Sequence, residues 1–229
     1  MKLLILNANT SGDVTARMVR ALEAVCPKNV QLVPVTAGFG HPYVSDRQGA
    51  VIAGHAALEA VRAAVEREAA NGRTPFDGGL YACFGEPGIE ALRADNAFPL
   101  AGMAEASIVT ALQLGERFSI VTAGEAWTGM LRDLMRRTCL DSRFAGFGIV
   151  NADALSLARG AGEGLALVEA AITQTVSTHK CDVVIVGGAS LAGYGVALAP
   201  RFDLPVLDGL SVAFEQALVL ARIHRRRRA

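Results

Sequence analysis

The chain has 229 residues, of which 52% are hydrophobic and 19% are charged, so it can bury a large core in one compact unit or in two small lobes. Basic and acidic residues are equal at 22 each, which excludes the charge balance typical of a nucleic-acid binder or of a cation buffer. Its apolar runs fall well short of the about 20 residues that span a bilayer. We expect a soluble, cytoplasmic protein with no nucleic-acid and no membrane partner.

Short apolar runs alternate with alanine-rich stretches along the chain, a pattern that predicts β-α units and a mainly parallel sheet. The predicted strands are 2–6, 29–34, 79–83, 99–102, 118–122, 144–149, 183–186 and 205–207. The predicted helices are 14–25, 48–70, 89–94, 102–114, 126–138, 152–179 and 209–223. Capping residues precede the first helix, and Asn71-Gly72 suits the end of the second.

The second half of the chain repeats the layout of the first. Cys83 stands where an apolar strand runs into a glycine turn, and Ala189 stands at the matching point 106 residues later. Pro99 and Pro205, which open the next apolar runs, have the same separation. The repeat predicts an α/β protein of two similar pseudo-symmetric lobes, each a mainly parallel sheet flanked by helices, with the active site in the cleft between them. The approximate lobes are 1–98 with 206–229, and 99–205.

Four polar or glycine-bearing turns follow the carboxyl ends of predicted strands, where ligands bind in open parallel sheets. These turns are expected to converge on one crevice, and their backbone N–H groups can hold a small anion such as a carboxylate. The candidate substrate-binding residues in them are Asn9, Thr10, Phe84, Gly85, Thr122, Ala123, Gly124, Ala189 and Ser190.

Cys83 is the candidate acid/base residue. It ends its strand and precedes the helix at 89–94, whose positive end is expected to lower the thiol pKa. The other cysteines, Cys26, Cys139 and Cys181, are interpreted as inert buried side chains. The four show no CxxC spacing and no histidine at metal-site spacing, which argues against a disulfide framework or a zinc site.

Several further residues carry weaker signals. His41 lies in a glycine-rich loop that could act as a lid, and His55 lies within a helix; both are candidate bases. Ser190 lacks the Gly-x-Ser-x-Gly setting of a nucleophile and is expected to donate a hydrogen bond. Residues 225–228 are predicted to form a solvated, disordered tail. Three carboxylates are interpreted as surface or capping groups, namely Glu86, Glu105 and Asp208.

These motifs together resemble the aspartate/glutamate/hydantoin racemase superfamily over nearly the whole chain. Asn7-Ala8-Asn9-Thr10 is similar to the family's Asn-Pro-Asn-Thr opening, and Cys83-Phe84-Gly85-Glu86-Pro87-Gly88 is similar to the Cys-Phe-x-Asp-Pro-Gly of hydantoin racemases. The resemblance continues in 99–106, 114–122 and 204–209. It implies a cofactor-independent enzyme that uses cysteine to move a proton next to a carbonyl. The expected substrate is a small anionic, imide or ureido molecule, and we expect a homo-oligomer.

The second half departs from the family pattern at one position. The family's second cysteine lies in a Gly-Cys-Ala-Gly turn, and Ala189 stands in its place. Cys181 lies eight residues earlier, about 26 Å away at about 3.3 Å per residue, and cannot replace it. Two-base racemisation needs a base on each face of a planar carbanion, and Ser190 has no evident partner to lower its pKa.

The sequence therefore favours carbanion chemistry at Cys83 and argues against an efficient symmetric racemase. It leaves open a one-sided decarboxylase or isomerase, since arylmalonate decarboxylases of this superfamily also keep one cysteine, although in the second half. It also leaves open a non-catalytic member that binds a small metabolite.

Overall fold

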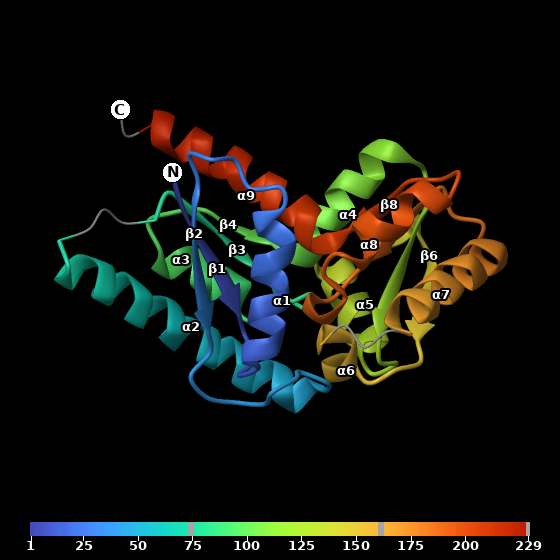
Figure 1. The fold of residues 1–229 in the computed structure, drawn as a ribbon, viewed down its shortest axis with the longest axis horizontal. Helices are drawn as coiled ribbons and strands as arrows, with labels where there is room; N and C mark the ends of the chain where they lie inside the picture. Colours follow the sequence, from blue (N-terminus) through green and yellow to red (C-terminus); the bar gives the residue numbers. More distant parts are fainter. Residues whose placement is uncertain (73–75, 160–162, 228–229) are drawn as a thin grey trace.

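The computed structural model describes residues 1–72, 76–159 and 163–227, and the strands there form two four-stranded parallel sheets (Figure 1). The first sheet has the order β2-β1-β3-β4, with β1 at Lys2–Asn7, β2 at Gln31–Thr36, β3 at Gly78–Tyr81 and β4 at Leu100–Gly102. The second has the order β6-β5-β7-β8, with β5 at Phe118–Ala123, β6 at Phe144–Val150, β7 at Val183–Val186 and β8 at Val206–Asp208. The shared topology confirms the predicted α/β fold of two similar lobes.

Helices cover both faces of each sheet (Figure 1). On the first sheet, α1 (Gly12–Glu23) and α9 (Gly209–Arg226) share one face, and α2 (Arg47–Ala70) and α3 (Ile89–Asp95) share the other. On the second, α4 (Met103–Leu114) and α5 (Trp127–Arg137) pack toward the first lobe, whereas α7 (Gly164–His179) and α8 (Tyr194–Leu198) pack on the outer face. The short α6 (Ala154–Arg159) lies against α1. None of the helices in the described ranges combines the length and apolarity needed to cross a membrane.

Local sequence explains where the first helices begin. Ser11 is the N-cap of α1 and its hydroxyl accepts a hydrogen bond from the N–H of Val14 at 3.3 Å. Asp46 caps α2 in the same way through the N–H of Gly49 at 2.7 Å. Such caps satisfy N–H groups that have no partner within the helix. The first sheet's β1 is buried along its whole length, as expected of a parallel strand covered on both faces.

Two predicted elements differ in the structure. The single helix expected at 152–179 is two helices, α6 and α7, and residues 160–162 between them lie outside the described ranges. The sequence between the two helices contains Gly160 and Gly162, and α7 begins with Gly164; each glycine is about 1 kcal/mol less favourable than alanine inside a helix. The tail prediction was also wrong for Arg225 and Arg226, which belong to α9; Arg228 is not among the described residues.

The predicted lobe boundaries at 98/99 and 205/206 each separate a strand from its sheet. Strand β4 pairs with β3 in the first sheet, and β8 pairs with β7 in the second. The chain therefore changes lobe after β4 and returns after β8. The returning segment is α9, whose Ala221 lies against Gly78 of β3. Pro99 and Pro205 directly precede these edge strands, and the strands stay with their own sheets.

The repeat also has a small irregularity. In the strand ladders Tyr81 pairs with Gly102, and Val186 pairs with Asp208. Strand β3 therefore corresponds to β7 at a separation of 105 residues, and β4 corresponds to β8 at a separation of 106 residues. The second half therefore has one more residue than the first between its third and fourth strands. Counted from the end of the third strand, Cys83 corresponds to Gly188, and Ala189 is the next residue.

Aromatic rings and glycines join the two lobes. A core cluster of buried residues runs from the first sheet across the interface to one face of the second. At its cleft end the Phe84 ring occupies the space beside Gly187, and the Trp127 ring occupies the space beside Gly85. A Cβ at either glycine would overlap the ring of the opposite lobe. Each lobe therefore supplies one ring and one glycine to the other.

We predict that Gly187→Ala destabilises the protein by about 1–3 kcal/mol, because the added methyl group forces Phe84 out of a packed interior. Urea unfolding followed by circular dichroism measures this. Gly38→Ala is the matched control, since a Cβ at Gly38 has no atom within 4 Å. Equal stability of the two variants would contradict the interlocked arrangement.

Candidate active site

A small cavity lies between the lobes at the carboxyl ends of both sheets. Its volume is about 30 Å³, which is room for about one water molecule. The first lobe lines it with Asn9, Tyr43, Val44, Ala82, Cys83 and Phe84, and the second with Thr122, Trp127, Gly188 and Ala189. Five of the predicted site residues thus meet in one place, namely Asn9, Cys83, Phe84, Thr122 and Ala189.

The thiol of Cys83 is buried against this cavity. Burial raises its pKa to about 12, and the negative charge of Glu86 adds to the rise, whereas the backbone N–H groups of Gly85 and Glu86 lower it. The expected net lowering was therefore wrong. The N–H groups that stabilise the thiolate come from the turn itself, and they do not offset the loss of water around the sulfur.

Asn9 presents an amide N–H group to the cavity. Its Oδ1 accepts hydrogen bonds from Asn7 Nδ2 and from the backbone N–H of Ser11, both at 2.9 Å. These bonds fix the amide orientation. Among the described residues Asn9 Nδ2 has no hydrogen-bond partner, so it can donate to an oxygen of a bound molecule.

The second lobe presents hydroxyl groups and no thiol. Thr122 lines the cavity, and its hydroxyl has no hydrogen-bond partner in the described part of the chain. The buried Oγ of Ser190 likewise lacks one there. Gly188 has a φ of 131°, a conformation that a side chain rarely adopts. Ala189 is therefore the cavity-lining residue of this turn at which a second thiol would be tolerated.

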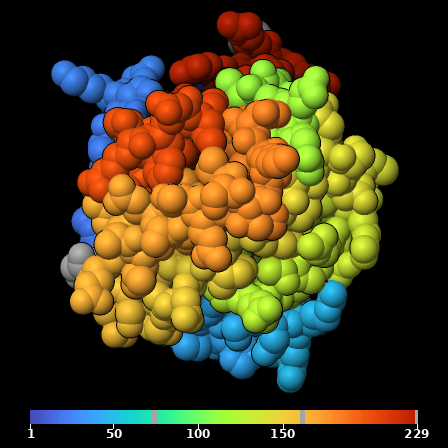
Figure 2. All heavy atoms as spheres, turned by 90° about the vertical axis from the view of Figure 1, so that its right-hand side faces the viewer, coloured from blue at the N-terminus to red at the C-terminus, as the bar shows by residue number. Residues whose placement is uncertain are grey.

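Two aromatic residues that the sequence analysis did not select close the cavity. The Tyr43 hydroxyl donates to the carbonyl of Ala123 and accepts from Trp127 Nε1, both at 3.1 Å. Burial raises the pKa of Tyr43 to about 12, although the hydrogen bond with Trp127 lowers it. The segment around residues 40–50 thus reaches from the first lobe onto the second, where it is light blue at the lower edge in Figure 2. The glycine-rich loop before this segment was predicted to act as a lid. The candidate residue chosen from it was His41, whereas Tyr43 makes the contact to the second lobe.

The remaining predicted residues lie around the cavity or away from it. The backbone N–H of Thr10 donates a hydrogen bond to the carbonyl of His41 at 3.1 Å. Gly124 forms a turn before α5 with a φ of 91°. The side chains of His41 and His55 are exposed. Cys181 is buried, but Cys139 is exposed and Cys26 half-buried, so burial was wrongly expected for those two. Glu86 and Asp208 do cap helices, and Glu105 pairs with Arg93.

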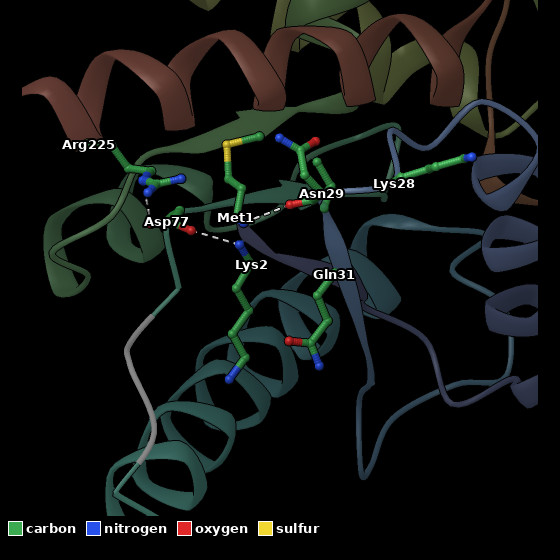
Figure 3. A pocket seen from close by; sticks show the side chains of 8 residues that line it. Met1, Lys2, Lys28, Asn29, Gln31, Asp77 and Arg225 are labelled. Atoms are coloured by element: carbon green, nitrogen blue, oxygen red, sulfur yellow. Dashed lines mark hydrogen bonds and ion pairs between the residues drawn. The ribbon is translucent and has the colours of Figure 1, made fainter.

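A larger hollow of about 710 Å³ lies at the opposite, amino-terminal end of the first sheet. Figure 3 shows that its polar groups do not converge: the side chain of Lys2 extends toward α2, where it pairs with Glu68, and Lys28 points away. Asp77 is already bonded to the N–H of Lys2 at 2.7 Å and paired with Arg225 at 3.6 Å. The geometry favours the smaller cavity as the reaction site. Within the described ranges no cluster of three or more His, Cys, Asp or Glu side chains could hold a metal ion.

Comparison with known proteins gives consistent matches. Residues 3–217 match the model of the Asp/Glu/Hydantoin racemase family. A hydantoin racemase of Pseudomonas sp. (strain NS671) is 24% identical over 96% of this chain and 86% of its own length. The structure is similar to allantoin racemase from Klebsiella pneumoniae, with 26% identity, a TM-score of 0.88, and coverage of 97% of this chain and 88% of the other. Allantoin racemase from Pseudomonas fluorescens has 25% identity, the same TM-score, and coverage of 97% and 92%.

We predict that Tyr43→Phe loosens the closure of the cavity and costs about 0.5–1.5 kcal/mol of stability, because Trp127 Nε1 and the carbonyl of Ala123 both lose their partner. Trp127 is the one tryptophan of the chain, so a red shift of its fluorescence measures the opening. Tyr194→Phe is the matched control, because it removes a 3.2 Å bond to the carbonyl of Leu157. Identical emission in Tyr43→Phe and the unmodified protein would contradict the role of this contact.

Proposed function

The chain belongs to the Asp/Glu/Hydantoin racemase family, and we propose that it is an isomerase that moves the proton on a carbon next to a carbonyl, with Cys83 as the acid/base group. The observation that carries the proposal is the position of Cys83: its thiol lines a small cavity between the lobes together with Asn9 and Thr122. Proton transfer by a positioned side chain of this kind is worth about 10²–10⁴ in rate.

The lining of the cavity favours a neutral ring as substrate. No Lys, Arg, His, Asp or Glu side chain is among its lining residues in the described part of the chain. A free amino acid would bring an ammonium and a carboxylate into this site without charged partners, which is costly. A hydantoin or another small imide or ureido compound needs only hydrogen bonds to its oxygens. The racemases to which the chain is similar are named for substrates of this type.

In the proposed reaction the substrate carbonyl oxygens are held by Asn9 Nδ2 and by the Thr122 hydroxyl. Removal of the proton next to the carbonyl gives an enolate, and these donors stabilise its negative oxygen. Cys83 takes the proton as a thiolate or returns one as a thiol. The other proposed substrate contacts are the turn residues Thr10, Phe84, Gly85, Ala123, Gly124, Ala189 and Ser190.

A one-sided reaction is the second candidate, and the methyl group of Ala189 favours it. Cys83 serves one face of the planar intermediate, and the turn that lines the other side offers Gly188 and Ala189, neither of which can carry a proton. Isomerisation with protonation by Cys83 fits this arrangement, whereas decarboxylation would bring a carboxylate against a described lining that has no charged side chain. A protein that only binds a metabolite is the non-catalytic alternative, and an unreactive Cys83 would support it.

We expect Cys83→Ala and Cys83→Ser to lower proton exchange by about 10²–10⁴ while the fold persists. The measurement is NMR of an enantiopure 5-alkyl hydantoin in D₂O, with a sample without enzyme as the background. Circular dichroism checks the fold. Near-normal exchange by Cys83→Ala would remove Cys83 from the mechanism.

We further expect the unmodified protein to exchange the proton of one enantiomer much faster than it interconverts the two. Ala189→Cys should raise racemisation strongly, because it supplies a second thiol to the unserved face, provided that this thiol comes within about 3–3.5 Å of the reacting carbon. Polarimetry beside deuterium exchange on the same substrate measures both rates, and Ala189→Ser is the control for size. Fast racemisation by the unmodified protein, unchanged in Ala189→Cys, would show that another residue serves that face.

A further inference from the structure

A buried carboxylate holds the turn that carries Cys83. Glu86 is 2% exposed and has a φ of 51°, a conformation that costs energy for any residue with a Cβ. Its Oε1 accepts hydrogen bonds from the N–H groups of Ala104 at 2.6 Å and Glu105 at 2.8 Å. These are the second and third residues of α4, whose own N-cap, Gly102, has no side chain. Glu86 therefore caps α4 from the neighbouring turn.

The second lobe makes the same connection from the opposite end. Asp208 is the N-cap of α9, and its Oδ1 accepts from the N–H of Ser211 at 3.1 Å. Its Oδ2 accepts from Gly193 at 2.7 Å and Gly195 at 3.2 Å, in the turn that follows β7. Gly102 and Asp208 have the same φ of −82°. In each lobe one buried carboxylate joins a helix N-terminus to the turn after the third strand.

The connection in the first lobe bears directly on the thiol. The N–H of Glu86 donates to the carbonyl of Cys83 at 3.0 Å, and the N–H groups of Gly85 and Glu86 stabilise the thiolate. Because the Glu86 side chain is anchored on α4, the turn that carries Cys83 cannot move away from α4 without breaking these two hydrogen bonds.

We propose that Glu86 is a positioning residue for Cys83: its carboxylate anchors the turn on α4 and so fixes the backbone that carries the sulfur. The proposal rests on the proposed function of Cys83 as the reacting thiol.

The charge of Glu86 acts in the opposite direction to its anchoring. The groups that face it are Cys83 and Tyr81 from β3 and its turn, Glu105 from α4 and Arg93 from α3. Burial raises the pKa of Glu86 to about 7, and Glu105 adds to the rise, whereas the N–H groups of α4 and Arg93 lower the pKa. Once ionised, the carboxylate raises the pKa of Cys83. Loss of the charge and loss of the anchor therefore change thiol reactivity with opposite signs.

The test is the rate at which iodoacetamide labels Cys83 in the folded full-length protein at pH 8, followed by mass spectrometry. Glu86→Gln keeps an oxygen acceptor and removes the charge, so labelling is expected to stay equal or to rise. Glu86→Ala removes the anchor as well, and labelling is expected to fall about tenfold, the effect of one unit in thiol pKa. The exposed Cys139 is the internal reagent control. A rate in Glu86→Ala equal to or above that of the unmodified protein overturns the proposal.

Asp182→Asn is the matched control for loss of a carboxylate. Asp182 Oδ2 also accepts from two consecutive backbone N–H groups, those of Glu116 at 2.9 Å and Arg117 at 2.8 Å. These residues precede β5 and β7, at the edge of the second sheet opposite the cavity. The Cys83 labelling rate should be unchanged in this variant. A fall as large as that in Glu86→Ala would show a general loss of stability and would overturn the proposal.

Variants that move the carboxylate from position 86 to position 102 distinguish two roles of Glu86, anchoring the turn and capping α4. A Cβ at Gly102 would meet the Glu86 carboxylate at its three nearest atoms, and Glu86→Ala vacates that space. Added to Glu86→Ala, Gly102→Asp reproduces the arrangement of Asp208 and should restore both the labelling rate and the thermal midpoint. Gly102→Ser can cap α4 but is too short to reach the turn, so it should restore only the midpoint, by about 2–4 °C.

Equal rescue of labelling by the aspartate and serine variants would show that Glu86 is only a helix cap. In proton exchange we expect Glu86→Ala to lower kcat about tenfold with KM unchanged. Exchange that persists in Cys83→Ala would refute the proposed function, and the labelling result would still stand on its own.

Discussion

The two lobes lock together through rings that fit against glycines. Phe84 from the first lobe fills the space at Gly187, and Trp127 from the second fills the space at Gly85. Both glycines are next in sequence to residues that line the cavity, namely Phe84 and Gly188, so the contacts that hold the lobes together also set the distance between Cys83 and the turn at Ala189. In the proposed reaction, the packing at this interface would define the faces of the reacting carbon and so the stereochemistry of proton transfer.

The closed interface also decides the resting state of the thiol. Burial raises the pKa of Cys83 to about 12, although the backbone N–H groups of Gly85 and Glu86 lower it. In the proposed reaction, the thiolate that removes a proton would therefore need hydrogen-bond donors or polarity that the substrate supplies. The cavity has room for about one water molecule, and the Tyr43 hydroxyl bonds to the second lobe at its edge. In the proposed reaction, entry of a ring would require the walls of the cavity to separate, and this separation would also bring water to the thiol.

Much of the architecture could be predicted from the sequence, because buried parallel strands are apolar runs bounded by turns. The eight strands, the shared topology and the meeting of Asn9, Cys83, Thr122 and Ala189 follow from that pattern. The break between α6 and α7 was missed because alanine-rich composition outweighed three nearby glycines. The approximate lobe boundaries leave β4 and β8 apart from the sheets with which they pair, because an apolar run does not tell which sheet its strand joins.

The features that the sequence could not reveal depend on contacts between distant segments. Tyr43 and Trp127 are 84 residues apart, and neither stands in a recognisable motif. From the sequence alone Glu86 is interpreted as an ordinary surface or capping carboxylate, because the sequence does not show that its partner is the N-terminus of α4. The raised pKa of Cys83 is a third example, since local sequence shows the N–H groups of the turn but not how far water is excluded. Such properties come from packing of the whole molecule.

The return of the chain from the second lobe to the first through α9 has a consequence for biosynthesis. The first sheet is formed by residues up to 102, but one face is covered by α9, whose Phe214, Leu218 and Ala221 are buried in the core. On the ribosome this face stays uncovered until the final segment emerges, by which time the strands of the second lobe are already available to pair. The lobe that holds the thiol is thus the last to be completed. Apolar surface of the nascent first lobe, exposed during this delay, is where a chaperone would be expected to bind.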